Sequence, residues 1–209
     1  MPRPRSGETL LFIGDSITEC MRQSVAPPLG AGYVQFAHVM LAARHPSLEV
    51  TFLNRGIDGE TVLDLERRWE RDVVAQRPDW LFVMIGVNDV LYRHVGDQRE
   101  RAVDDATYAA TLERLVRRTQ DATDARIVLL EPTPLEADLT SPSHAMMRSL
   151  VRVVHEVGRA RGVEVVEVYE RFFEAVAASP TRRWMVDVPH PELCGQAVIA
   201  LALLEHLGW

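Results

Sequence analysis

Five short apolar runs alternate along the chain with longer segments of helical periodicity, and this alternation restricts the fold more than any other feature. The runs are rich in β-forming residues and have few polar ones, which is typical of strands buried on both faces. Strands that alternate with helices predict an α/β fold, with a parallel sheet covered by helices on both sides. The predicted strands are residues 10–13, 50–53, 80–85, 127–130 and 163–168.

Five longer segments with helical periodicity lie between and after these runs. In the third of them, Tyr108, Leu112 and Leu115 share one face, while charged residues occupy the opposite face. Asp104 or Asp105 is a candidate cap for this helix, because a short acidic side chain accepts a hydrogen bond from its first free N–H groups. The predicted helices are residues 33–44, 62–76, 106–121, 143–161 and 194–206.

Composition limits the class of protein. The chain has 209 residues, of which 47% are apolar, and this predicts one well-buried domain spanning residues 1–209. The net charge is -7 and basic residues are scattered among acidic ones, which argues against a nucleic-acid partner. The apolar run at 198–204 is far shorter than a membrane span, and the run at 10–13 is too short for a secretory signal. We therefore expect no membrane association and a cytoplasmic location.

A serine follows the first predicted strand, in the sequence Gly14-Asp15-Ser16. Ligands bind at the carboxyl ends of the strands in an open parallel sheet, so this position suits a nucleophile. A serine hydroxyl reacts at neutral pH only with a base within hydrogen-bond reach and a third group that orients the base. The alternative is that Asp15 and Ser16 merely cap the next helix.

Asp187 and His190 are the candidate partners of this serine. They lie on one short turn before the last predicted helix, and Pro189 restricts Val188 to extended geometry. A carboxylate in this position can accept the proton of one ring nitrogen and leave the other nitrogen free to deprotonate Ser16. Of the other six histidines, His38, His155 and His206 lie in helix-like segments, and His45, His94 and His144 lie in loops or helix starts without a closely spaced acid pattern. The alternative is a surface turn that caps the last helix.

Acyl transfer also requires hydrogen-bond donors for the oxyanion that develops on the ester carbonyl. Gly59 follows the second predicted strand, and a glycine there lets a backbone N–H approach a substrate closely. Asn88 follows the third strand, and its side-chain amide is a second candidate donor. The alternative for both is ordinary turn chemistry, because glycine and asparagine are common in turns.

Taken together, these segments resemble a known family. Gly14-Asp15-Ser16, Gly59, Gly86-x-Asn88-Asp89 and Asp187-x-x-His190 are similar, in order and approximate spacing, to the four blocks of the SGNH (GDSL) hydrolases. Within that family, residues 10–18, 54–57, 77–80 and 84–90 look like those of the intracellular serine acetylxylan (xylo-oligosaccharide) esterases. The resemblance extends from about residue 10 to the carboxyl terminus.

The resemblance implies a three-layer α/β/α sandwich with a five-stranded parallel sheet in the flavodoxin-like order 2-1-3-4-5. It implies that Ser16 is the nucleophile, His190 the general base and acid, and Asp187 the group that orients His190. The oxyanion hole would consist of the Ser16 and Gly59 N–H groups and the Asn88 side chain. No metal or organic cofactor is implied, and a homo-oligomer is expected from the resemblance alone.

These observations predict a serine esterase that removes short acyl groups, chiefly acetyl, from xylo-oligosaccharides or related sugars through an acyl-enzyme intermediate. The substrate would be a small-molecule ester. One alternative is a lipolytic esterase or thioesterase of the same family with broader specificity. Another alternative, from a different class, is a carbohydrate-binding protein on the same scaffold without catalytic activity.

Four further side chains are candidate substrate contacts near the predicted site. Asp15, Glu60, Asp89 and Trp184 lie close in sequence to the expected triad and oxyanion donors. For Asp15 and Asp89 the alternative is a structural role that holds loops through backbone hydrogen bonds. For Trp184 the alternative is core packing. The two cysteines, Cys20 and Cys194, are expected to be free thiols that pack beneath the site.

Overall fold

The five apolar runs form one parallel sheet in the computed structural model, which describes residues 3–94 and 98–209. The strand order is β2-β1-β3-β4-β5 and every neighbouring pair is parallel, so the predicted order is confirmed. The strands are β1 (Thr9–Gly14), β2 (Thr51–Asn54), β3 (Trp80–Met84), β4 (Arg126–Leu130) and β5 (Glu164–Val166).

The last strand is shorter than the apolar run that predicted it. The N–H of Val163 bonds to the Gly158 carbonyl at the end of the preceding helix, so Val163 belongs to the helix terminus. Val168 has helical backbone angles and is the N-cap of the next helix. The apolar run therefore located the strand, whereas backbone pairing set its ends, and only Val166 and Val168 of the run are buried.

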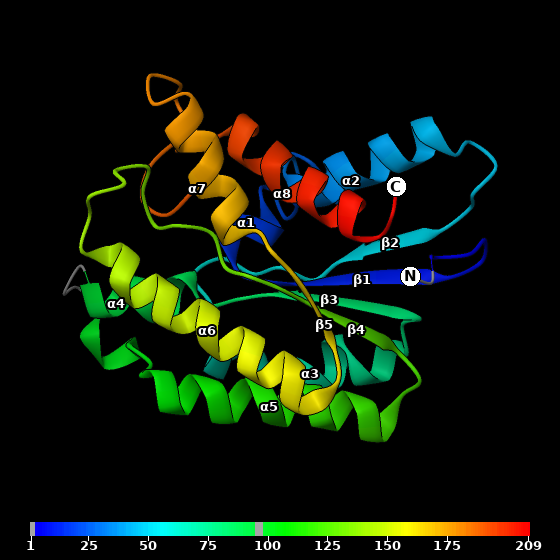
Figure 1. Ribbon diagram of the computed structural model, residues 1–209. Coiled ribbons are helices and arrows are strands. Elements are labelled where there is room, and N and C mark those ends of the chain that lie inside the picture. Colours follow the sequence, from blue (N-terminus) through cyan, green and yellow to red (C-terminus); the bar gives the residue numbers. More distant parts are fainter. Residues whose placement is uncertain (1–2, 95–97) are drawn as a thin grey trace.

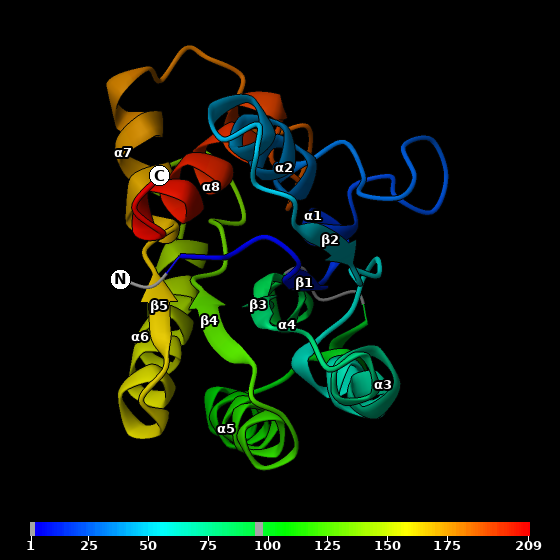
Figure 2. The same cartoon turned by 90° about the vertical axis from the view of Figure 1, so that its right-hand side faces the viewer.

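Helices cover both faces of the sheet and give the predicted three layers (Figures 1 and 2). One layer contains α1 (Ser16–Glu19), α2 (Tyr33–Arg44), α7 (Tyr169–Ala178) and α8 (Leu193–His206). The other contains α3 (Val62–Asp72), α4 (Val87–His94), α5 (Asp105–Ala122) and α6 (Ser143–Arg161). The short 3₁₀ helices are η1 (Val74–Gln76) and η2 (Arg99–Arg101).

Three helices are absent from the sequence prediction. α1 is only four residues long, and α4 begins directly after a strand in a segment interpreted as a turn. α7 buries Tyr169, Phe172 and Val176, whose spacing is a helical signal that the sequence reading missed. The predicted helix at 62–76 is divided at Val73 into α3 and η1. Asp104 caps α5 by accepting a bond from the N–H of Thr107, as expected.

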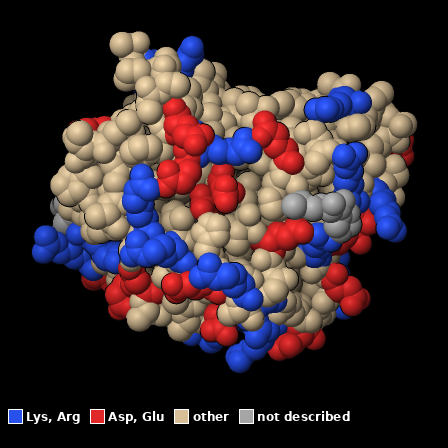
Figure 3. Space-filling model, viewed as in Figure 1, with Lys and Arg blue, Asp and Glu red and all other residues tan. Residues whose placement is uncertain are grey.

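Charged side chains link the outer helices. Arg148 of α6 pairs with Glu170 of α7, and Arg171 of α7 pairs with Glu205 of α8. Figure 3 shows basic and acidic side chains interspersed over this face. In the described part of the chain, none of the helices combines the length and apolar character needed to cross a bilayer.

Stacked aromatic rings fill the centre of the sheet face that α2 covers. The ring of Phe12 lies 4.6 Å from that of Phe82 and 5.4 Å from that of Phe52, with nearly parallel planes. It also meets Tyr33 of α2 edge to face. Phe12 and Phe82 are completely buried. Because β1 ends two residues before Ser16, this packing anchors the strand from which the predicted nucleophile follows.

Replacing Phe12 with Ala should lower the free energy of unfolding by about 3–5 kcal/mol, because the truncation leaves a cavity between rings that cannot close completely. Urea denaturation of the variant and the wild type measures the difference. The exposed Val25→Ala substitution is the control and should change stability by less than about 0.5 kcal/mol. Equal midpoints for F12A and V25A would contradict this role of Phe12.

Candidate active site

Ser16 is the first residue of α1, directly after the end of β1. Asp15 is the N-cap, and its carboxylate accepts a hydrogen bond of 3.0 Å from the N–H of Ile17. Gly14 precedes it at a point where a Cβ atom would lie 2.1 Å from the Met84 carbonyl oxygen, so only glycine fits. The capping role of Asp15 is therefore real, and it is compatible with a nucleophilic serine because the cap leaves the Ser16 hydroxyl free.

Asp187 and His190 lie at the tip of a short antiparallel hairpin before α8. The N–H of Val186 donates to the His190 carbonyl and the N–H of His190 donates to the Asp187 carbonyl, both at 2.8 Å. A bridge between Met185 and Pro191 closes the hairpin. The turn is consequently held by its own backbone bonds, and the two side chains project from one side of it.

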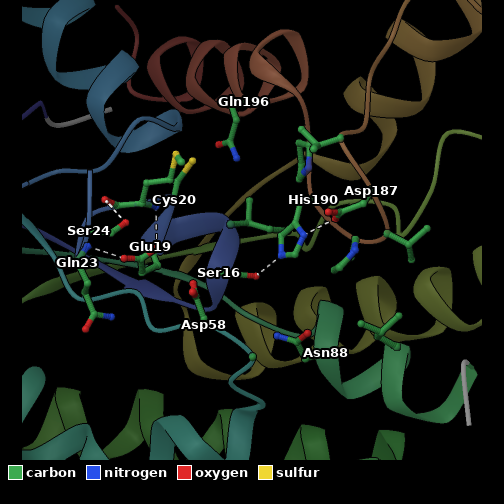
Figure 4. A pocket seen from close by; sticks show the side chains of 18 of the residues that line it. Ser16, Glu19, Cys20, Gln23, Ser24, Asp58, Asn88, Asp187, His190 and Gln196 are labelled. Atoms are coloured by element: carbon green, nitrogen blue, oxygen red, sulfur yellow. Dashed lines mark hydrogen bonds and ion pairs between the residues drawn. The ribbon is translucent and has the colours of Figure 1, made fainter. Parts of the chain in front are cut away.

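The hairpin brings His190 to the nucleophile (Figure 4). The Nε2 atom of His190 lies 2.9 Å from the Ser16 hydroxyl oxygen, and its Nδ1 atom lies 2.5 Å from an Asp187 carboxylate oxygen. When the neutral imidazole carries its hydrogen on Nδ1, Nδ1–H donates to Asp187 and Nε2 accepts the hydrogen of the Ser16 hydroxyl. The structure thus joins the three predicted triad residues in a chain of two hydrogen bonds, an arrangement that can activate a serine hydroxyl.

The three predicted oxyanion donors border the same pocket, whose volume is about 790 Å³. Within residues 3–94 and 98–209, the backbone N–H groups of Ser16 and Gly59 have no hydrogen-bond acceptor. Asn88 lies in the first turn of α4, and its amide donates one N–H to the Glu60 carbonyl at 2.9 Å. The second N–H of that amide stays available. The arrangement can therefore offer three donors to one developing charge.

The structure places the four predicted substrate contacts outside the lining of this pocket. Asp15 and Asp89 are buried, and the Asp89 carboxylate bonds to the N–H of Val62 at the start of α3. Both acids therefore fix loops, which is the structural alternative stated for them. Burial raises the pKa of Asp15 to about 8 and that of Asp89 to about 7.

Glu60 and Trp184 are also occupied by contacts within the protein. Both Glu60 carboxylate oxygens accept hydrogen bonds from Arg68, at 2.7 and 3.0 Å. Trp184 packs against Phe172, with ring centroids 6.2 Å apart, and its indole N–H donates to the Ser179 carbonyl. Trp184 is therefore part of the packing next to the hairpin that contains Asp187 and His190, in agreement with the packing alternative.

The residues that do line the pocket include several that the sequence reading missed. Gln196 points toward the pocket from α8, and Asp58 comes from the loop of the oxyanion glycine (Figure 4). Of these missed residues, only Asp58 could have been predicted from the sequence, because it directly precedes Gly59, a predicted oxyanion donor. Cys20 lines the pocket instead of lying beneath it. The polar and thiol-bearing lining residues beyond the triad and oxyanion set are Glu19, Cys20, Gln23, Ser24, Asp58, Tyr92, Gln98 and Gln196.

The charge in the pocket is acidic. Glu19, Asp58 and Asp187 contribute carboxylates, and among the described lining residues there is no arginine or lysine. Burial, reinforced by the nearby Glu19 carboxylate, raises the pKa of Asp58. Because like charges repel, this pocket favours a neutral ligand over an anionic one.

Known proteins share this architecture. Residues 12–198 match the model of the GDSL-like Lipase/Acylhydrolase family. The chain is 36% identical to an acetylxylan esterase of Geobacillus stearothermophilus, over 98% of this chain and 95% of that relative. The crystal structure of Axe2, an acetylxylan esterase from Geobacillus stearothermophilus, matches with a TM-score of 0.89 at 36% identity, over 100% of this chain and 97% of Axe2.

A second solved enzyme has the same architecture over nearly its whole length. LAE5, an alpha/beta hydrolase enzyme from the metagenome of Lake Arreo in Spain, matches with a TM-score of 0.89 at 31% identity. That match covers 98% of this chain and 97% of LAE5. Three further solved structures of Axe2 are of catalytic mutants, in which a serine, an aspartate or a histidine is replaced by alanine.

Asp15→Asn should make folding stability less dependent on pH. Between the ordinary pKa of 3.8 and about 8, folded Asp15 keeps its proton whereas the unfolded chain releases it. Raising the pH through this window therefore favours unfolding, by about 1 kcal/mol per pH unit for this one group. Asparagine cannot ionise and still accepts the Ile17 bond, so the stability of D15N relative to the wild type should rise from about pH 5 to about pH 8.

Urea unfolding at several pH values measures this difference. The exposed Asp124→Asn substitution is the matched control, and its stability should run parallel to that of the wild type. Parallel curves for D15N and the wild type would show that Asp15 is ionised in the folded protein.

Proposed function

Because this chain belongs to the GDSL-like lipase/acylhydrolase family, we propose that it is a serine esterase that removes acetyl groups from xylo-oligosaccharides or related sugars. One observation supports hydrolysis by a serine nucleophile: Ser16, His190 and Asp187 are joined by hydrogen bonds and line a pocket that the three candidate oxyanion donors also border. The substrate class is supported by similarity over nearly the full length to an acetylxylan esterase.

The reaction begins with attack of the Ser16 oxygen on the ester carbonyl carbon, while His190 Nε2 takes the hydroxyl proton. The carbonyl oxygen becomes an oxyanion held by the Ser16 and Gly59 N–H groups and by Asn88. The bond to the sugar oxygen then breaks, and the imidazolium of His190 donates its proton to that oxygen. Asp187 stabilises the imidazolium throughout.

Deacylation repeats these steps with water. His190 removes a proton from a water molecule as its oxygen attacks the acetyl-serine carbonyl, and the same donors hold the second oxyanion. Collapse releases acetate and returns the proton to Ser16. The Axe2 mutants support these roles, because the replaced aspartate and histidine lie three positions apart in Axe2, as do Asp187 and His190 here.

The pocket lining supports a neutral, hydroxyl-rich substrate. Gln23, Gln98 and Gln196 offer amide groups of the kind that bind sugar hydroxyls, and the carboxylates disfavour anionic esters. A protein that only binds carbohydrate would not require a serine aligned with a histidine and an aspartate. The relay therefore favours catalysis over the binding-only alternative.

An apolar rim favours a second candidate, a lipolytic esterase or thioesterase of broader specificity. Met21, Val186 and Val188 line the pocket and expose about half of their surface, at 51%, 53% and 46%. Such side chains suit either the faces of sugar rings or a longer acyl chain. We place the acetyl ester first because of the acetylxylan esterase relatives.

A cytoplasmic location and a homo-oligomeric assembly belong to the same proposal.

Ser16→Ala should lower kcat/KM on p-nitrophenyl acetate by about 10⁴-fold or more, because the variant has no nucleophile for His190 to activate. It should also abolish covalent labelling by a fluorophosphonate probe. The exposed Ser47→Ala substitution is the control and should keep full activity and labelling. Retained turnover in a folded S16A protein would exclude Ser16 as the nucleophile.

The two candidate substrate classes differ in acyl length. If the acetyl proposal is correct, kcat/KM for p-nitrophenyl acetate should exceed that for the octanoate ester by about tenfold or more, a difference worth over 1.4 kcal/mol in the transition state. Acetate release from acetylated xylo-oligosaccharides, measured by product analysis, should accompany it. A preference for octanoate would reject the acetyl proposal in favour of the lipolytic candidate.

A further inference from the structure

The carbonyl oxygen of Gly59 accepts hydrogen bonds from two side chains outside the triad and the oxyanion set. The Tyr92 hydroxyl donates to it at 2.9 Å, and the Nη2 atom of Arg101 donates to it at 2.8 Å. The two donors also contact each other, since Arg101 Nη1 lies 3.0 Å from the Tyr92 oxygen and the guanidinium carbon lies 4.7 Å from the ring centroid. A charged donor and a phenol thus converge on one backbone atom.

The guanidinium of Arg101 is itself fixed from other directions. Its Nη2 atom bonds to the Asp64 carboxylate at 3.0 Å, and Asp64 belongs to the capping box that begins α3 with Thr61. Burial opposes ionisation of Asp64, but the bonds from Thr61 and Arg101 lower its pKa overall. The Nη1 atom reaches the side-chain oxygen of Gln98 at 3.1 Å. Arg101 therefore links η2 to both α3 and the loop of Gly59.

Gly59 needs such a link because its own residue type does not fix its conformation. Its φ angle is +72°, in the left-handed region, and glycine populates many other conformations at similar cost. The Glu60 carbonyl that follows it is held by Asn88, but in the described chain no hydrogen bond holds the Gly59 N–H before substrate arrives. The N–H belongs to the peptide plane before the Gly59 Cα and the carbonyl to the plane after it, so the bonds to the carbonyl hold the second plane and the Cα and restrict the N–H through the φ and ψ angles of Gly59.

We infer that Arg101, together with Tyr92, is a positioning residue that holds the Gly59 backbone so that its N–H points at the substrate oxyanion. The inference rests on the proposed esterase reaction and adds to it a requirement from outside the catalytic set. An oxyanion donor acts only within about 3 Å of the developing charge, and a displacement of about 1 Å can cost about 100-fold in rate. Loss of Arg101 should therefore affect kcat more than KM.

The test compares Arg101→Met with Arg99→Met. The first removes the two donors to Gly59 and Tyr92 while keeping the aliphatic stem. The second removes the same charge from the same 3₁₀ helix, at an exposed residue that does not line the pocket. We expect R101M to lower kcat on p-nitrophenyl acetate by about tenfold or more with KM within about twofold, and R99M to match the wild type.

A tetrahedral adduct separates oxyanion positioning from a general loss of structure. 1,1,1-Trifluoroacetone adds reversibly to an active serine, and the resulting oxyanion occupies the oxyanion hole. Its inhibition constant should weaken in R101M by about the same factor as kcat/KM falls, whereas R99M should keep the wild-type value. Arg101→Lys, which retains one charged donor, should recover part of the loss.

Tyr92→Phe is the second variant in case R101M does not fold. It removes one hydroxyl from the same carbonyl without changing the charge, and it should lower kcat and weaken trifluoroacetone inhibition in parallel. The inference is overturned if folded R101M, or failing that folded Y92F, keeps the kcat and inhibition constant of R99M. It is likewise overturned if R101M raises only KM. A wild-type chain without esterase turnover would instead reject the proposed function itself.

Discussion

The site depends on one buried cation, the guanidinium of Arg68. It donates to the carbonyl of Gly14 at the end of β1, to the carbonyl of Arg55 after β2, and to the Glu60 carboxylate beside the oxyanion glycine. A second carboxylate, Asp72, lies 2.9 Å away and completes the pairing. A buried charge is tolerated only when it is paired and hydrogen-bonded on all sides, so these loops cannot separate without leaving Arg68 uncompensated.

Acidic residues of the site differ in role because they differ in burial. Asp15 and Asp89 are enclosed, and their raised pKa values suit carboxyl groups that hold loops. Asp187 is 62% exposed at its side chain, and its carboxylate contacts His190 Nδ1, the contact through which it would stabilise an imidazolium. Asp15 lies one position from Ser16 and Asp187 three positions from His190, so closeness in sequence does not separate the two functions and only the surroundings do.

The sequence predicted those parts of the fold and site that depend on a local pattern of residues. The apolar runs predicted the five strands, and the Asp187-x-x-His190 turn predicted an acid–imidazole pair because its two members lie three positions apart. Ser16 was joined to that pair by the chemistry that a serine nucleophile requires. The strand order came from the family resemblance. The pocket lining was out of reach, since Gln98 and Gln196 enter it from distant elements and no spacing marks them. Arg68 and Arg101 were missed because each reaches the site through backbone carbonyls, those of Gly14 and Arg55 for Arg68 and that of Gly59 for Arg101, and no sequence pattern marks which carbonyl an arginine contacts.

Ser16 and His190 are 174 positions apart, although their side chains are hydrogen-bonded. Translation adds Ser16 to the chain first and adds His190, its proposed base, 174 positions later. During translation the serine hydroxyl therefore stays chemically inert until β1 has been covered and the hairpin before α8 has left the ribosome. Any chain truncated before this hairpin therefore lacks the group proposed to activate Ser16, and esterase activity reports that two distant parts of the chain have come together.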